Sequence, residues 1–162
     1  MRRVVPVLVT LLIAAPAFAQ EQVGCDKFKW PLERERALLT QAPVAKSGGE
    51  IALGAAVKLT LVPVVEAKLP VPPSRTPKSG SYAGIIQISA LPATGTYRVT
   101  LTANAWVDVV QDGQIVPSGE FTGAGGCEGL RKSVKFKLNS KPAIIELTGM
   151  ETSEIGVAIT PD

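Results

Sequence analysis

From residue 51 onward the chain alternates apolar and polar side chains with a period of two, which fits β-strands and not helices. In the first such stretch, Val57 and Leu59 alternate with Lys58 and Thr60. Similar stretches recur about every ten residues, at 57–61, 82–89, 97–103, 105–110, 115–116, 133–138, 145–147 and 154–160. Strands at this spacing predict a mainly β protein, an antiparallel β-sandwich or jelly roll of about eight strands.

Glycine and proline mark the connections between these strands. The pair Asp112-Gly113 is typical of a tight hairpin turn. The segment 69–80 contains four prolines and is expected to be an extended surface connection. Residues 121–129 contain four glycines and are expected to form a loop.

The beginning of the chain has the pattern of a secretory signal peptide. Arg2 and Arg3 precede an apolar run at 4–15. Ala17 and Ala19 then supply the small residues that a signal peptidase requires. Because the run is too short to span a membrane, we expect cleavage after Ala19 and a periplasmic or secreted product. The predicted organisation is a signal peptide at 1–19, an N-terminal extension at 20–50 and a β-sandwich domain at 51–162.

The N-terminal extension is predicted to contain one short helix, at 31–40. Pro31 suits the first position of a helix, and the acidic residues that follow it are favoured by the helix dipole. Leu32 and Leu39 lie two turns apart, so both can dock on one core. Residues 42–50 contain proline and a Ser-Gly-Gly sequence, which indicates a linker.

Cys25 and Cys127 are the two cysteines of the chain. Because an exported protein folds in an oxidising compartment, we predict that they form a disulfide. A lipid-modified Cys25 is the alternative, but the residues before it lack the expected pattern and lie far from the apolar run. Phe28 and Trp30 lie close to Cys25 in sequence and are expected to anchor the extension to the sandwich.

Charge and composition exclude several kinds of partner and cofactor. Removing Arg2 and Arg3 from the 17 basic residues leaves 15 against 14 acidic ones, so a nucleic-acid-binding balance is absent. The remaining sequence has no apolar run long enough for a membrane span. The chain contains no histidine. Nucleophile–histidine catalysis and two-histidine iron sites are therefore excluded, and we expect no metal and no cofactor.

A hydrolase that uses two carboxylates needs no histidine. Asp108 with Asp112 or Glu120 could supply such a pair. However, Asp112 belongs to the Asp-Gly hairpin signal, and a turn explains it better than catalysis. We therefore expect a protein that is not an enzyme.

Trp106 and Asp108 are the candidate ligand-binding residues. If Val107 and Val109 face the core, Trp106 and Asp108 point to the opposite side of the strand. An outward indole beside a carboxylate could stack on a sugar ring while the carboxylate binds its hydroxyls. Alternatively, a bulge at Asn104 turns Trp106 inward, or the N-terminal helix covers it.

Arg131, Lys135 and Lys137 fall on one face of a predicted strand, together with Ser133. These cations could contact an anionic polymer of the cell envelope. A solvated outer face explains the same pattern, and edge lysines also discourage strand-to-strand aggregation.

The run from Leu91 to Leu101, Leu-Pro-Ala-Thr-Gly-Thr-Tyr-Arg-Val-Thr-Leu, is followed by Trp-Val-Asp-Val-Val-Gln-Asp-Gly at 106–113. Together these motifs resemble the bacterial pre-peptidase C-terminal domain, and the resemblance covers residues 83–160. It implies a jelly-roll-like accessory domain of exported proteins, usually attached to an enzyme.

Together these features predict an exported, non-catalytic β-sandwich that binds a partner protein or an envelope glycan. The alternative is a structural or assembly factor that docks onto an exported enzyme through the edge of a sheet. A glycan binder should expose an aromatic ring in a groove, whereas an assembly factor should expose an apolar patch or an unpaired edge strand.

Overall fold

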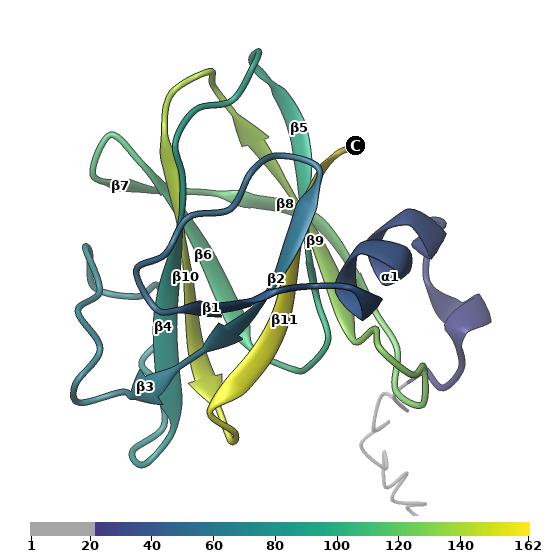
Figure 1. Ribbon diagram of the computed structural model, residues 1–162, viewed down its shortest axis with the longest axis horizontal. Helices are drawn as coiled ribbons and strands as arrows, with labels where there is room; N and C mark the ends of the chain where they lie inside the picture. The colour runs from purple at the N-terminus through teal and green to yellow at the C-terminus, as the bar shows by residue number, and fades with distance from the viewer. Residues whose placement is uncertain (1–21) are drawn as a thin grey trace, which may run out of the picture.

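A computed structural model describes residues 22–162 and shows two packed β-sheets with a short helical region at one side (Figure 1). The predicted signal peptide lies outside the described residues. The first sheet contains, in spatial order, β1 (Val44–Lys46), β2 (Ala55–Thr60), β11 (Glu154–Pro161), β5 (Gly95–Leu101), β9 (Lys132–Leu138) and β8 (Ser118–Gly123). The second contains β3 (Val62–Pro63), β4 (Tyr82–Ile88), β10 (Ala143–Met150), β6 (Trp106–Gln111) and β7 (Gln114–Val116).

The predicted fold class is confirmed, with eleven strands in the described chain rather than about eight. Each of the eight predicted stretches overlaps a strand. The additional strands β1, β3 and β8 are too short or too polar to show the alternation. β1 lies in the segment predicted to be a linker and pairs with β2 in parallel, whereas the other neighbouring strands pair antiparallel. β8 exposes four of its six residues, including part of the predicted loop.

The alternating apolar residues fill the space between the two sheets, which is the reason for the period of two. Val99 and Val157 of the first sheet are fully buried, as are Val109 and Ile145 of the second. Each such side chain contributes roughly 1.5–3 kcal/mol by leaving water. The hairpin between β6 and β7 turns at the predicted Asp-Gly pair, where Asp112 adopts a φ of 53°.

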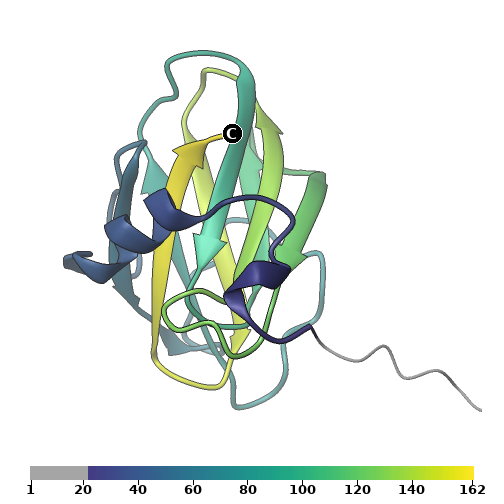
Figure 2. The same cartoon turned by 90° about the vertical axis from the view of Figure 1, so that its right-hand side faces the viewer.

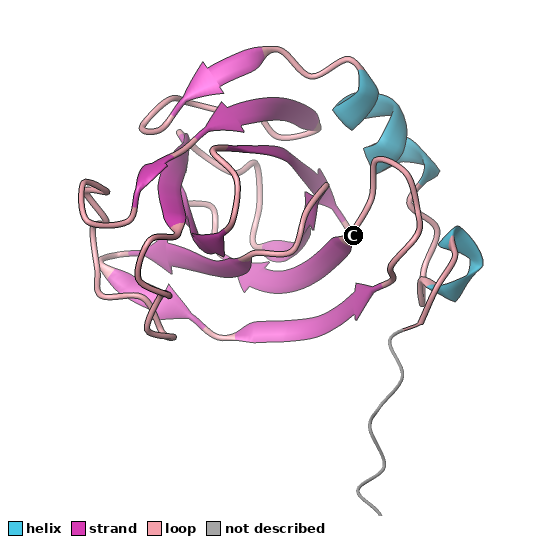
Figure 3. Cartoon of the chain, turned by 90° about the horizontal axis from the view of Figure 1, so that it is seen from below, coloured by secondary structure: helices cyan, strands magenta, loops and turns pink. Residues whose placement is uncertain are grey.

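Residues 22–43 of the N-terminal extension lie outside the sandwich on the first sheet, as Figures 2 and 3 show, whereas β1 joins that sheet. The extension contains a 3₁₀ turn, η1 (Cys25–Lys27), and α1 (Glu33–Thr40), which packs against β2 and β11. As predicted, Leu32 and Leu39 both dock, in a small cluster with Leu130. Within residues 22–162 no helix is long and apolar enough to cross a membrane.

Candidate functional site

A pocket of about 410 Å³ opens beside Trp106, at the end of the second sheet where β6 begins. One wall comes from the proline-rich connection, and another from the turn that follows β10. The aromatic and charged residues that line it are Arg75, Lys78, Trp106, Lys132 and Glu151.

The proline-rich connection at 69–80, here called the strap, is the long loop between β3 and β4 (Figure 1). Its prolines have no N–H to donate, so few backbone groups can attach it to the sheet. Val71 N donates to Glu146 Oε1 at 3.2 Å, and Ser74 N donates to Asp108 Oδ2 at 3.0 Å. Glu146 and Asp108 are opposite each other in the pairing of β10 with β6. Two carboxylates of the sheet therefore hold the strap against it.

Trp106, Ser74 and Asp108 form a closed set of hydrogen bonds at the wall of the pocket. Trp106 Nε1 donates to Ser74 Oγ at 2.8 Å and to Asp108 Oδ1 at 3.2 Å. Ser74 Oγ donates to Asp108 Oδ1 at 2.5 Å. Because the indole N–H and the strap share one acceptor, the ring is fixed before any ligand arrives.

Trp106 lies as the strand alternation predicts, pointing away from the core that contains Val107 and Val109. Its side of the strand is open enough to leave Trp106 37% exposed, so neither a bulge nor the N-terminal helix hides it. Asp108, by contrast, is only 5% exposed, and both of its oxygens accept bonds from the strap. Asp108 is therefore a positioning residue in this structure, rather than the contact to ligand hydroxyls that the sequence suggested.

Glu146 was not recognised from the sequence. It is 1% exposed, and its Oε2 has no hydrogen-bond partner in the described structure. Burial raises the pKa of Glu146; the hydrogen bond from Val71 N opposes this shift, and the charge of Asp108 adds to it.

A second tryptophan lies among cations on the outer face of the first sheet. Lys135 Nζ is 4.5 Å from the ring centroid of Trp30, and Arg98 Cζ is 5.7 Å from it. Trp30 Nε1 donates to Ser133 Oγ at 3.4 Å. Asp162 accepts from Arg98 at 2.6 Å and lies 2.8 Å from Lys135 Nζ. Trp30 thus anchors the extension, as predicted, and an acid balances the cations beside it.

Buried Glu35 adds a further acid to this region. It is 1% exposed and accepts from Thr160 Oγ1 at 2.6 Å and from Arg34 Nη2 at 2.8 Å. Burial on its own would raise the pKa of Glu35, but the hydrogen bonds from Thr160 and Arg34 outweigh it and hold that pKa below its ordinary value.

The three cations predicted to share one strand face, Arg131, Lys135 and Lys137, lie in different environments because Trp30 packs on that face. Ser133 is fully buried under Trp30, and Lys135 is engaged with Asp162. Lys137 is exposed, and Arg131 is half-buried with an interaction of its own. The face is therefore largely covered by the extension, and contact of Arg131, Lys135 and Lys137 with an anionic polymer stays a prediction.

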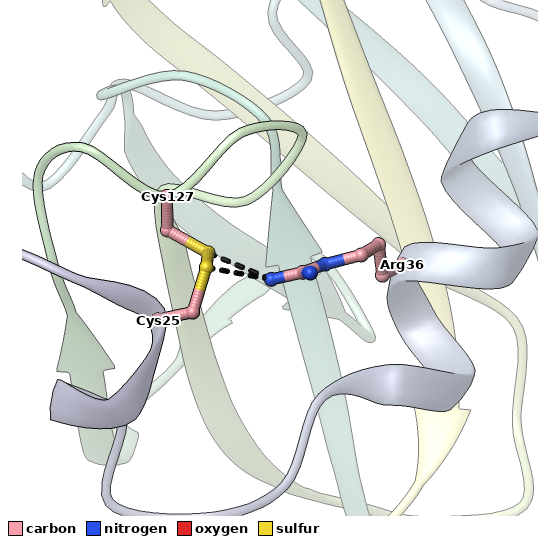
Figure 4. The surroundings of a disulfide bond; sticks show 3 residues. All are labelled: Cys25, Arg36 and Cys127. Carbon is pink, nitrogen blue, oxygen red and sulfur yellow. Dashed lines mark hydrogen bonds between the residues drawn. A yellow bond between two sulfur atoms is a disulfide. The ribbon is translucent and has the colours of Figure 1, made fainter.

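Cys25 and Cys127 form the predicted disulfide, which ties the extension to the loop before β9 (Figure 4). Arg36 of α1 donates through Nη2 to both sulfur atoms at 2.8 Å. The bond and the helix therefore support each other, and Cys25 has no free thiol for lipid attachment in this structure.

The carboxylates considered for hydrolysis lie in separate environments. Asp108 is held by the strap, while Asp112 lies in the hairpin turn and pairs with Lys141 at 2.8 Å. Glu120 is exposed on the edge strand β8. The structure pairs Asp108 with Glu146 instead, and both are closed off from the pocket by burial.

Sequence reasoning missed the cations of the Trp106 pocket. Lys132 had a visible signal, because it occupies a core-facing position in the alternation of β9, two residues before buried Val134. Arg75 and Lys78 could not be recognised, because the sequence of the strap does not predict which surface of the sheet the strap covers.

No family model, curated protein or solved structure matches this chain. The resemblance to the pre-peptidase C-terminal domain therefore stays a prediction, and the geometry of the site carries the functional proposal.

Proposed function

We propose that this protein is an exported, non-catalytic binding module that holds a glycan of the bacterial cell envelope in the pocket beside Trp106. The leader-like N-terminus and the Cys25–Cys127 disulfide support a periplasmic or secreted location.

The observation that carries this proposal is a partly exposed indole whose orientation is fixed in the wall of a polar pocket. Trp106 is 37% exposed, and Ser74 and Asp108 hold its N–H. A flat ring that is already positioned loses little conformational entropy on binding and offers an apolar surface among polar groups. Sugars have the matching character, with an apolar ring face and polar edges.

Calorimetric titration with oligosaccharides released from bacterial envelopes tests the proposal. The wild type should bind a glycan saturably, and Trp106→Ala should weaken binding by about tenfold or more, as loss of a central aromatic contact does. Lys137→Gln is the matched control, because it removes an exposed charge from another face. Absence of saturable binding to any envelope glycan contradicts the proposal.

Fluorescence gives a second readout of the same site. The chain has two tryptophans, so Trp30→Phe leaves Trp106 as the only indole. Its emission should shift during titration if the ligand contacts the ring, and an unchanged spectrum at saturation would place the ligand elsewhere.

The second candidate, an assembly factor, rests on β8. This strand lies at the edge of the first sheet, and its Phe121 is 60% exposed. A partner that added a strand there would slow amide hydrogen exchange at 118–123. Phe121→Asp would weaken that association and leave glycan binding unchanged, which separates the two functions.

A further inference from the structure

Three cations surround the pocket beside Trp106. Arg75 Cζ lies 5.4 Å from the centroid of the indole, and Lys132 Nζ lies 5.5 Å from it. Lys78 lines the same pocket. The residues that the structure describes place no carboxylate within ion-pair distance of any of the three. The pocket therefore carries an excess of positive charge.

Lys132 is the most constrained of these cations. Its ammonium group donates to the carbonyl of Ala105 at 3.2 Å and is half-buried. Burial lowers the pKa of Lys132, the charges of Arg131 and Arg75 lower it further, and Asp108 opposes them. A cation in such surroundings gains from any anion that approaches it.

Asp108 does not provide that anion within the pocket. Its Oδ1 accepts from Ser74 Oγ and Trp106 Nε1, and its Oδ2 accepts from Ser74 N. Glu151 lines the pocket but is exposed to water, so it balances little of the charge. Three cations thus surround an opening whose lining contains one acid, the exposed Glu151.

We infer that the ligand is an acidic saccharide, whose carboxylate binds Arg75 and Lys132 beside the indole of Trp106. The inference rests on the proposed function and names its class of ligand. A guanidinium can receive a carboxylate through two parallel hydrogen bonds, and such charge-assisted bonds are the stronger kind. A neutral sugar offers no such partner to the two cations that lie over the indole.

The strap gives the anion site a defined shape. Arg75 follows Ser74 directly, and Ser74 is fixed to Asp108 through its N–H and its hydroxyl. The base of the Arg75 side chain is therefore positioned, while its exposed guanidinium remains free to turn toward a ligand. Release of Ser74 should misplace Arg75, so Asp108 acts on binding through the strap.

Titration calorimetry at low salt with trigalacturonate, maltotriose and inorganic phosphate tests the inference. Trigalacturonate should bind at least about tenfold more tightly than maltotriose, and added salt should reduce the difference, as for any interaction between charges. Arg75→Gln and Lys132→Gln should each remove most of this preference. Arg75 is exposed, so its variant retains the fold even if the Lys132 variant does not.

The outcomes separate the inference from the proposed function. Equal binding of trigalacturonate and maltotriose overturns the acidic class and leaves a glycan-binding site. Inorganic phosphate that binds as tightly as trigalacturonate also overturns it, because the pocket then recognises a bare anion. Binding of neither saccharide by a protein that binds envelope oligosaccharides also overturns the inference, whereas absence of binding to those oligosaccharides as well contradicts the proposed function itself. Lys137→Gln should behave as the wild type, and a loss of preference in this control would assign the effect to overall charge.

Discussion

The two tryptophans of this protein have similar neighbours and different charge balance. Each indole lies near one arginine and one lysine, and each N–H donates to a serine. Beside Trp30, Asp162 neutralises both cations. Beside Trp106, the acid that lies closest is occupied by the strap, and the cations have no ion-pair partner among the described residues.

This difference separates a structural cluster from a candidate binding site. An aromatic ring with cations is not by itself a functional signal, because such contacts occur often in folded proteins. At Trp30 the charges are balanced within the cluster, and the cluster joins the extension to the first sheet. At Trp106 the same groups surround a pocket. The unbalanced charge, rather than the aromatic ring, distinguishes the two.

The largest expected effect on stability comes from releasing the N-terminal extension, which carries Trp30, from the first sheet. Cys25→Ser combined with Cys127→Ser removes a bond that spans 102 residues. For a loop of about 100 residues the expected loss is up to about 4–5 kcal/mol of unfolding free energy, which strain lowers. Urea unfolding measures it, and limited proteolysis should show cleavage within residues 22–43.

Ligand binding at Trp106 should survive in this double variant, if the protein is assayed below its unfolding midpoint. The hydrogen bonds that hold the strap and Trp106 run to Asp108 and Glu146, not to the disulfide or the extension, so we expect only the extension to be released. An unchanged urea midpoint, or loss of saccharide binding in the folded variant, would contradict the separation of the two regions.

The two tryptophans provide the next comparison. Trp30→Ala should lower the unfolding free energy by roughly 2–4 kcal/mol, because it empties a packed junction between the extension and the sheet. Trp106→Ala should lower it by about 1 kcal/mol or less, because that ring is partly in water and Ser74 keeps its bond to Asp108. Chemical unfolding of both variants checks this order, and equal losses would argue against it.

The fold could be predicted from the sequence because the alternation is local. Residues such as Val99, Thr100 and Leu101 show the period of two without knowledge of any neighbour. The disulfide followed from the count of cysteines and the expected compartment. β8 was not predicted, because most of its residues from Ser118 to Gly123 are exposed and its sequence therefore shows no alternation of apolar and polar side chains.

The sites were harder to predict because they depend on pairs of distant segments. Trp106 was recognised from the face of its strand. The role of Asp108 was not, because it depends on Ser74, 34 residues away, which crosses over it in the strap. Likewise, Lys135 is covered by Trp30, which no local signal places there. The extended conformation of a long proline-rich connection can be predicted from its own sequence. The surface on which that connection packs depends on the whole fold.

The smallest expected effects come from one acid in each region, and they should have opposite signs. The folded state raises the pKa of Glu146 above its ordinary 4.5, mainly through burial. Its stabilising contribution is therefore full below about pH 4.5 and is lost as the pH rises through the raised pKa. Glu146→Gln keeps an acceptor for Val71 N and removes the buried charge. It should stabilise the protein by about 1 kcal/mol at neutral pH, and this gain should disappear in acid.

Asp162 should show the reverse dependence. A hydrogen bond from Lys135, together with Arg98, lowers its pKa below the ordinary 3.8 and outweighs the effect of burial. Its contribution is present above that ordinary value and is lost as the pH falls through the lowered pKa. Because Asp162 is partly exposed, Asp162→Asn should cost no more than about 1 kcal/mol at neutral pH. Urea unfolding of both variants across the acid range gives the answer. A shift of both variants in the same direction at neutral pH would contradict the opposite pKa shifts of Glu146 and Asp162.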